Sequence, residues 1–292
     1  MLTHLTAHAL GEGCPLDAHA RFAWLWIRLR ERFPDALAAC LMPDHVHLAL
    51  PGVPEEAPGD LSQLLRGHSQ VFGLGRAWGP VAAPAVHEDV RKVRRQLRYI
   101  LLNPCRTVRL RGRRVSLVDD PMRWWWSTHR DTLGGAVEPW VSPEDLARFL
   151  GESVDGFSAR WHRYVSGDPS VHPAGSPLPD PAPARTVPHH TLEQIRLASL
   201  AATRASPKAL RRRSRTRRLF IGLAHHEGWR FNAQLARACG ITPRSARRLA
   251  AAPRLQDLPA ARLCLGDPRL RDPVGTLAPE WENGDERPYF GR

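Results

Sequence analysis

The sequence has few tyrosines, no paired cysteines and no long apolar run. Its five cysteines are spread over 292 residues without a Cys-x-x-Cys pair. That spacing indicates neither a disulfide framework nor a zinc knuckle. No apolar stretch reaches membrane-spanning length, and the N-terminus lacks a basic-then-apolar signal segment. The sequence therefore predicts a soluble, cytoplasmic protein.

Tyrosine is scarce enough to limit the chemistry. The chain contains only Tyr99, Tyr164 and Tyr289. Tyr164 adjoins a proline-rich segment, and Tyr289 lies three residues from the C-terminus. A site that needs a tyrosine nucleophile therefore has one candidate, Tyr99.

Acidic residues are outnumbered by basic ones. The chain carries 42 Lys and Arg against 29 Asp and Glu, a formal charge of +13, and a sequence pI near 10.9. Arginine supplies nearly all of the positive charge and favours forked contacts with phosphate. An arginine- and alanine-rich chain can also come from a GC-rich genome, so charge alone does not assign a nucleic-acid partner.

The first 150 residues alternate between strand-like and helical patterns. We expect a strand over 1–10, a helix over 16–33, a strand unit over 37–50 interrupted at Pro43-Asp44, a helix capped by Asp60, and a helix over 88–102. A β-like segment over 107–117, a tryptophan run over 124–126 with two of its three side chains in the core, and a small helix near 143–150 follow. This order predicts an α+β fold of the ferredoxin-like (RRM-like) kind with an antiparallel sheet.

A proline-rich segment divides the chain. Seven prolines lie between Ser166 and Pro188, a composition typical of a linker. We therefore expect a catalytic domain over 1–165, a linker over 166–188, a small helical domain over 189–252 and a poorly ordered tail over 253–292.

Two histidines, His45 and His47, lie one residue apart in the strand-like segment MPDHVHL over 42–48. Side chains on a strand alternate with period two, so both point to the same face. They could hold one metal ion between them, although such a pair also occurs without any metal role.

The helix over 88–102 places its tyrosine outside the apolar stripe. Tyr99 has Asn103, Gln96, Lys92 and Arg95 as helical neighbours instead. A tyrosine used for packing would lie within the stripe. Among cations and amides, a phenol is more easily deprotonated and a phosphate can be held.

These residues together suit phosphodiester chemistry. Two imidazoles and one amide oxygen leave coordination positions open, which suits Mg²⁺ or Mn²⁺ as a Lewis acid. We therefore take His45, His47 and Asn103 as candidate metal ligands and Tyr99 as the candidate nucleophile. Lys92 and Arg95 are candidate DNA contacts. Tyrosine attack would form a phosphotyrosine and release a hydroxyl, so rejoining would need no nucleotide cofactor.

The two motifs, MPDHVHL over 42–48 and YILLNP over 99–104, resemble those of the single-tyrosine HUH transposases, most closely the REP-associated tyrosine transposases. The resemblance covers about residues 1–150. It implies a ferredoxin-like fold, divalent-metal-dependent cleavage of single-stranded DNA, and a 5′-phosphotyrosine intermediate; we expect hairpin DNA as a further substrate. His45 and His47 match the family's metal-binding pair, Tyr99 its nucleophile and Asn103 its polar third ligand.

Residues 235–249 have the pattern of a helix-turn-helix. Ala236 is small, Gly240 can form the turn, and Thr242 can cap a second helix that starts at Pro243. The candidate DNA contacts are Arg244, Arg247 and Arg248 of that second helix, and Arg211, Arg212, Arg213 and Arg215 of the basic segment over 208–218 upstream. A small helical bundle with a solvated basic face would give the same pattern.

We therefore expect a two-domain, metal-dependent DNA strand transferase that acts as a monomer or homodimer, with duplex DNA as a second partner. One alternative is a DNA-binding regulator of repeat elements that keeps the fold but does not cut. Another is a metal hydrolase that uses an activated water, which would tolerate Tyr99→Phe.

Overall fold

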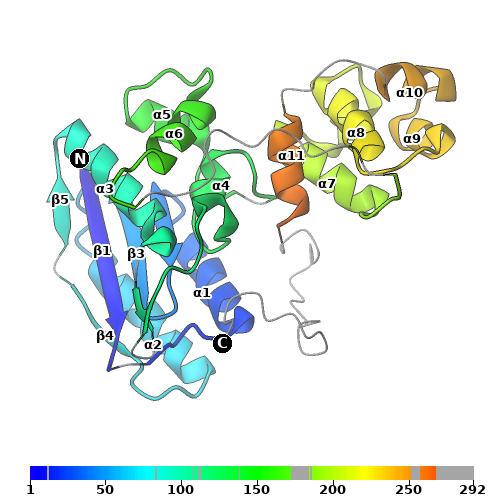
Figure 1. Ribbon diagram of the computed structural model, residues 1–292. Coiled ribbons are helices and arrows are strands. Elements are labelled where there is room, and N and C mark those ends of the chain that lie inside the picture. Colours follow the sequence, from blue (N-terminus) through cyan, green and yellow to red (C-terminus); the bar gives the residue numbers. More distant parts are fainter. Residues whose placement is uncertain are drawn as a thin grey trace. The chain divides into compact units, whose positions relative to one another are not determined.

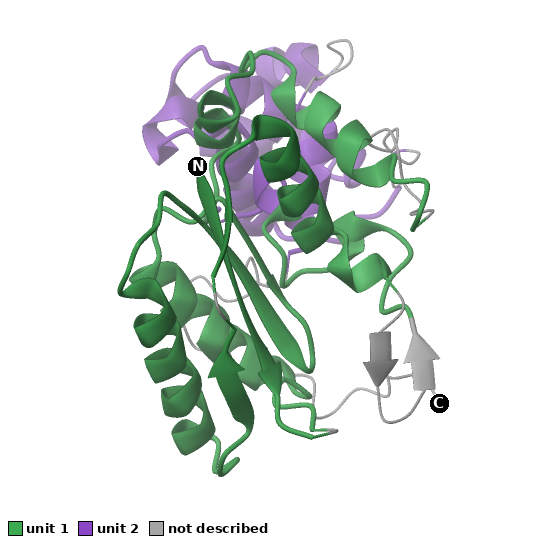
Figure 2. Cartoon of the chain, turned by 90° about the vertical axis from the view of Figure 1, so that its left-hand side faces the viewer, with its two compact units in different colours: residues 1–129, 140–177, 276–292 green, residues 130–139, 178–275 purple. Residues whose placement is uncertain are grey.

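The computed structural model describes residues 1–11, 13–82, 84–106, 108–110, 113–137, 139–171, 184, 186–250 and 257–267, without side chains at 108–110 and 113–115. The chain divides into two compact units (Figure 2). Unit 1 comprises residues 1–129, 140–177 and 276–292, and unit 2 comprises residues 130–139 and 178–275.

Unit 1 alternates strands and helices (Figure 1). Its elements are β1 (Leu2–Ala9), α1 (His19–Arg32), β2 (Ala38–Leu41), β3 (His45–Pro51), α2 (Ala57–Val71), β4 (Trp78–Val81), β5 (Ala85–His87), α3 (Val90–Leu101), β6 (Val108–Leu110), β7 (Arg113–Val115), α5 (Pro143–Phe149) and α6 (Phe157–Ser166). Short 3-10 turns η1 (Asn103–Cys105) and η2 (Pro121–Arg123) interrupt the chain between them. No helix among the described residues is long and apolar enough to cross a membrane.

The main sheet of unit 1 is antiparallel. Its strand order is β2-β3-β1-β4, and β5 also pairs with β1. The longest pairing joins β1 to β3 and aligns Thr6 with His47 and His8 with His45. Helices together with an antiparallel sheet confirm the predicted α+β class.

The core of unit 1 contains side chains from the apolar stripes that helical periodicity predicts. Leu25, Trp26 and Leu29 of α1 are buried, and α1 ends at Arg32 ahead of Pro34. In the tryptophan run over 124–126 the first and third side chains are buried and the second is half-buried, as predicted. The indole of Trp124 donates to the carbonyl of Leu41 at 2.9 Å, which ties this segment to β2.

Three features of unit 1 differ from the sequence expectations. Helix α2 starts at Ala57, because Pro58 fits a first helical turn, so Asp60 does not cap it and pairs with Arg32 of α1 instead. The short strands β4 and β5 lie where no strand was predicted, and α6 lies where no helix was predicted. Residues 166–171 do not belong to a linker, because Asp168 binds arginines of unit 1.

Unit 2 is helical. It contains α7 (Leu192–Thr203), η3 (Pro207–Arg211), α8 (Arg215–His226), α9 (Asn232–Cys239), α10 (Pro243–Ala250) and α11 (Leu258–Leu265), and α4 (His129–Thr132) lies where the chain passes from unit 1 to unit 2. Gly240 ends α9 at φ 63°, and the Thr242 hydroxyl accepts from the Ser245 amide at the start of α10. The predicted turn and cap are therefore present.

The boundaries of unit 2 also differ from expectation. Residues 130–139 belong to unit 2, although they lie far from it in sequence. Within unit 2, η3 and α8 are separate elements, because Ser214 caps a new helix by accepting from the Arg217 amide. Helix α11, whose Ala261 and Cys264 are fully buried, lies in the predicted tail; residues 172–183, 251–256 and 268–292 lie outside the described residues.

His68 of α2 is a buried base whose titration we expect to affect stability. Its side chain has no exposed surface, and Trp78 donates to Nδ1 at 3.3 Å. Burial, and then the charge of Arg21, lower its pKa from the ordinary 6.5 to about 4. Below pH 6.5 the unfolded chain therefore binds a proton that the folded protein takes up only near pH 4, so folded stability falls as pH drops through this range.

We predict that His68→Asn, which keeps an acceptor for Trp78, makes unfolding less sensitive to acid. The loss in free energy of unfolding between pH 7 and pH 5 should be about 1 to 2 kcal/mol smaller than in the parent. Urea denaturation followed by tryptophan fluorescence measures it, with Ser62→Ala on the same helix as control. Equal pH dependence in parent and variant would show that His68 is not the group responsible.

Candidate functional site

Histidines of two adjacent strands form a cluster on one face of the sheet. His4 and His8 of β1 alternate with inward residues, as do His45 and His47 of β3, and the β1–β3 register brings them together. The ring centroids of His45 and His47 lie 4.8 Å apart. His4 lies 5.1 Å from His47, and His8 stacks on His45 at 5.1 Å.

Asn103 connects the two histidines of β3. It begins η1, directly after α3, and only 3 % of its surface is exposed. Its Oδ1 lies 3.0 Å from His45 Nε2, and its Nδ2 lies 2.8 Å from His47 Nε2. One amide group therefore meets the inner nitrogens of both imidazoles.

The hydrogen-bond chain continues outward from both histidines. On one side Asp44 Oδ1 lies 2.7 Å from His45 Nδ1. On the other, His47 Nδ1 lies 3.0 Å from His4 Nε2, and His4 Nδ1 lies 3.0 Å from Gln96 Nε2 of α3. The chain thus runs from Gln96 to Asp44 through the cluster.

Burial favours the neutral forms of His4 and His47. Burial and then the neighbouring His87 lower the pKa of His4 to about 4. Burial and then the nearby histidines lower the pKa of His47 well below its usual value. Burial alone would raise the pKa of Asp44, but its hydrogen bond and charge interaction with His45 hold that pKa below the usual range.

The Asp44 carboxylate accepts, so His45 donates from Nδ1 and a neutral ring has only a lone pair at Nε2. That nitrogen faces Asn103 Oδ1, which is also an acceptor. Two acceptors 3.0 Å apart are satisfied by a cation or a proton between them. The donor set therefore fits a bound cation.

The amides of Asn103 and Gln96, as placed, require opposite proton positions on the imidazoles of His47 and His4, which lie between them. Asn103 Nδ2 donates to His47 Nε2, which puts the His47 proton on Nδ1 and the His4 proton on Nδ1 as well. The Nε2 of Gln96 is a donor and faces that same Nδ1 of His4. Turning the Gln96 amide would satisfy this proton arrangement, whereas turning the Asn103 amide would satisfy the opposite one, with the His4 and His47 protons on Nε2.

Tyr99 lies against this cluster. Its ring meets that of His47 edge to face, with centroids 5.6 Å apart, and 39 % of its surface is exposed. The structure thus brings together the four residues selected from the sequence, namely Tyr99, His45, His47 and Asn103. Among the described residues no group of three His, Cys, Asp or Glu side chains is arranged to hold a metal, so the candidate ligand set depends on the asparagine.

Arg106, which no sequence pattern indicated, packs against the ring of Tyr99. The guanidinium of Arg106 lies 4.9 Å from the centroid of the Tyr99 ring. Asp168 lies 3.8 Å from Arg106 and 3.2 Å from Arg98. The Nε of Arg106 is buried and has no hydrogen-bond partner among the described residues.

Helix α6 contacts α3 through an aromatic ring and two arginines. The ring of Tyr164 lies between Arg94 at 4.8 Å and Arg98 at 4.7 Å. Lys92 and Arg95, the candidate DNA contacts of α3, are both exposed. The alternation of His4 and His8 along the first strand was a sequence signal for the extended cluster, whereas Arg106 and Asp168 had none.

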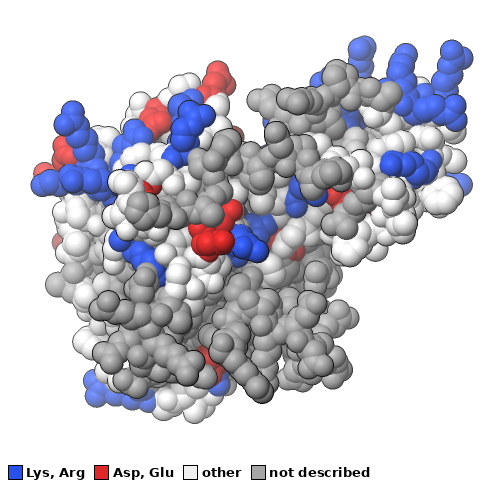
Figure 3. Space-filling view, in the orientation of Figure 1, with Lys and Arg blue, Asp and Glu red and all other residues white. Residues whose placement is uncertain are grey.

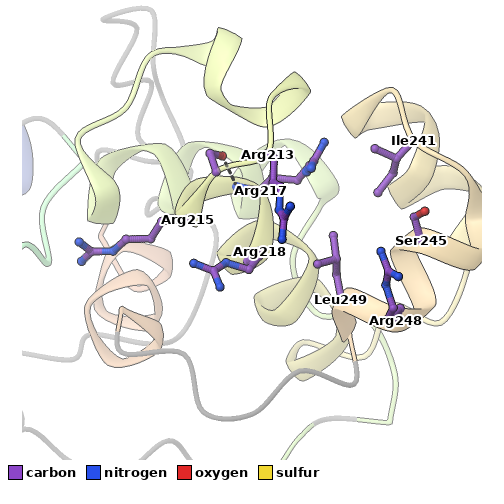
Figure 4. Close-up of a pocket in the computed structure, with 9 residues that line it drawn as sticks. Arg213, Arg215, Arg217, Arg218, Ile241, Ser245, Arg248 and Leu249 are labelled. Carbon is purple, nitrogen blue, oxygen red and sulfur yellow. Dashed lines mark hydrogen bonds between the residues drawn. The ribbon is translucent and has the colours of Figure 1, made fainter.

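The remaining candidate residues belong to unit 2. Arg213, Arg215 and Arg248 line a cavity of about 890 Å³, together with Ser214, Arg217, Arg218, Ile241, Ser245 and Leu249 (Figure 4). Arg211, Arg212, Arg244 and Arg247 are exposed and are not among its lining residues. Basic side chains gather on the surface over α8, α9 and α10 (Figure 3).

Comparisons with known proteins give one structural match to report. No protein-family model matches the chain, and no curated protein matches it. A solved structure of a REP-associated tyrosine transposase bound to a REP hairpin matches with 20 % identity and a TM-score of 0.36, over 44 % of this chain and 78 % of that one. At that TM-score the match assigns no function, which has to come from the side chains of this protein.

We predict that Asn103→Ala destabilises unit 1, because it removes the donor to the buried Nε2 of His47 and leaves space beside the buried Nε2 of His45. The expected loss is about 2 kcal/mol or more in free energy of unfolding. Urea denaturation measures it, and Ser62→Ala, which removes a half-buried hydroxyl bond to Pro58, should lose about 1 kcal/mol or less. A loss at Asn103 no larger than at Ser62 would mean that the amide is not shared by both rings.

Proposed function

We propose that this protein is a metal-dependent DNA strand transferase of the single-tyrosine HUH kind. It cleaves and rejoins single-stranded or hairpin DNA through a 5′-phosphotyrosine intermediate on Tyr99. The observation that carries the proposal is the contact of the Tyr99 ring with His47, whose inner nitrogen shares the Asn103 amide with His45.

The topology of unit 1 supports the proposal. Helix α1 joins β1 to β2, α2 joins β3 to β4, and the antiparallel order is β2-β3-β1-β4. We infer from this order that the sheet is ferredoxin-like, as the motif resemblance implies. The two central strands, β1 and β3, carry the histidines, and α3 delivers both Gln96 and Tyr99.

His45, His47 and Asn103 would hold the metal ion. Their two imidazole nitrogens and one amide oxygen suit Mg²⁺ or Mn²⁺. When bound, the ion would supply Lewis-acid stabilisation of charge on the scissile phosphate. Asp44 orients His45 through Nδ1, and His4 orients His47 in the same way.

The covalent step exchanges one phosphoester bond for another, between the phenol and the DNA. The Tyr99 oxygen forms a bond to phosphorus as the bond from phosphorus to the 3′ oxygen breaks. The phenol proton is lost, and the departing 3′ oxygen gains one, so the product is a 3′-hydroxyl strand and a 5′-phosphotyrosine. Attack by a 3′-hydroxyl reverses the step and rejoins DNA without another energy source.

Arg106 is placed to serve this step. Its guanidinium over the Tyr99 ring provides a positive charge beside the phenol. Phosphate oxygens are the natural acceptors for such a guanidinium. Asp168 restrains Arg106 without occupying all of its donors.

Unit 2 would add affinity for duplex DNA. We propose that α9 and α10, joined at Gly240, act as a helix-turn-helix whose second helix presents Arg244, Arg247 and Arg248. The absence of acidic residues in α10 and the exposure of its arginines support this role.

Two other functions give different experimental outcomes. A DNA-binding regulator would use the same surfaces without cutting. A metal hydrolase would cut with an activated water and form no adduct. The contact between Tyr99 and the histidine cluster favours the strand transferase over both.

We predict a covalent protein–DNA adduct. The parent protein, given Mn²⁺ and a pool of 3′-labelled hairpin oligonucleotides with randomised single-stranded flanks, should yield a labelled species that survives denaturing electrophoresis. Tyr99→Phe should abolish it, because the attacking oxygen is gone. Tyr164→Phe, which keeps the ring between Arg94 and Arg98, should leave it intact.

Each alternative would show itself in the same assay. Retention of labelled hairpin without cleavage by the parent identifies the regulator. Cleavage without adduct, unchanged in Tyr99→Phe, identifies the hydrolase. Either result rejects the strand transferase.

We further predict that residue 96 sets the affinity for the ion. His47 can offer its Nε2 lone pair only with its proton on Nδ1, which moves the His4 proton to Nδ1 and requires an acceptor at residue 96. Gln96→Leu removes that acceptor and should weaken Mn²⁺ binding about tenfold. Gln96→Glu supplies a permanent acceptor and should bind at least as tightly as the parent.

Electron paramagnetic resonance of free Mn²⁺ during titration measures both variants without any reaction. Arg91→Gln, an exposed position on the same helix, changes the charge by as much as Gln96→Glu and is the matched control. Equal affinity in the Leu and Glu variants would mean that the proton arrangement of His4 does not reach the metal site.

A further inference from the structure

The arginine-lined cavity of unit 2 has features of an anion site. It lies at the start of α8, and its lining comes from residues 213–218, from Ile241 before α10, and from α10 itself (Figure 4). Five of its nine lining residues are arginines, namely Arg213, Arg215, Arg217, Arg218 and Arg248. None of the lining residues is acidic.

Only one of these arginines has a carboxylate partner among the described residues. Arg215 forms an ion pair with Asp257. The other four, Arg213, Arg217, Arg218 and Arg248, face the same cavity without such a pair. Like charges that share a cavity repel one another, and a bound anion removes that repulsion.

The helix itself adds to this positive potential. The partial positive charge of a helix N-terminus favours acidic residues, yet the first turn of α8 has none and carries arginines instead. Ser214 caps the helix by accepting from the Arg217 amide. Arg217 also has a buried Nε with no hydrogen-bond partner among the described residues, so one donor here is unused.

The cavity is larger than a phosphate and is not uniformly polar. At about 890 Å³ it can take a phosphate together with an attached sugar. Ile241 and Leu249 supply an apolar wall opposite the α8 arginines (Figure 4). Arginines that bind phosphate beside side chains that pack on a sugar match a nucleotide of a nucleic-acid strand.

We propose that this cavity binds a backbone phosphate of DNA and fixes the position of α10 on the duplex. A contact with the phosphate backbone carries no sequence information directly, so we expect it to form on duplexes of any sequence. Arg244 and Arg247 lie on α10 outside the cavity and are free to approach the groove. The inference rests on the proposed DNA-binding role of unit 2 and assigns its phosphate contacts to Arg213, Arg217, Arg218 and Arg248.

The test uses the full chain carrying Tyr99→Phe, so that no covalent product forms. Fluorescence anisotropy with a labelled 20-base-pair duplex of arbitrary sequence gives the affinity at several salt concentrations. Arg217→Gln and Arg248→Gln should each weaken binding about three- to tenfold and should lower the salt dependence by about one unit of slope. Arg248 is exposed, so its variant remains informative if Arg217→Gln perturbs folding.

Arg237→Gln is the matched control, because Arg237 is an exposed arginine of α9 outside the cavity. It should change neither the slope nor the affinity beyond about twofold. Equal effects of Arg217→Gln, Arg248→Gln and Arg237→Gln would overturn the proposal. Inorganic phosphate and thymidine monophosphate are separate arms, and micromolar binding of either, with duplex binding unaffected by the variants, would assign the cavity to a small anion.

A failure of the cavity proposal can be distinguished from a failure of the proposed strand transfer. Variants of the cavity in the Tyr99 background should still form the adduct at saturating hairpin concentration, because unit 1 carries the nucleophile. Absence of an adduct in the parent would reject strand transfer while the anisotropy result stands. An adduct in the parent, with no effect of Arg217→Gln or Arg248→Gln on duplex affinity, would reject the cavity alone.

Discussion

The site depends on one shared side chain, the amide of Asn103 between the inner nitrogens of His45 and His47. Asn103 can reach them because α3 ends at Leu101 and η1 places the next polar residue against β3. A buried amide that meets two imidazoles is stable only if each contact is satisfied. This requirement ties the end of α3 to the centre of the sheet, and it positions Tyr99 one turn earlier.

The hydrogen-bond chain couples the proton positions of these residues. At one end Asp44 holds the His45 proton on Nδ1. At the other end the Gln96 amide determines which nitrogen of His4, and through it of His47, carries the proton. Because the two amides demand opposite tautomers, the network is poised between a form that offers both Nε2 lone pairs and one that does not. A cation bound at the proposed site would select the first form, and its binding would then be linked to the position of the proton on His4.

Much of this could be predicted from the sequence, for identifiable reasons. Period two placed His45 and His47 on one face, and helical spacing placed Asn103 one turn after Tyr99, so local rules found the centre of the site. Arg106 and Asp168 come from segments whose contacts depend on tertiary packing, and no local pattern announces them. Helix α11 was missed because its short apolar run, Leu258–Leu265, lies among prolines and is stabilised by burial against unit 2.

The most direct measurement is anomalous X-ray diffraction from crystals of the protein soaked in Mn²⁺. The account predicts a manganese peak bonded to Nε2 of His45, Nε2 of His47 and the side-chain oxygen of Asn103, with Tyr99 beside it. A contradictory result would be the Asn103 amide still hydrogen-bonded between the two rings, with manganese absent or bound elsewhere.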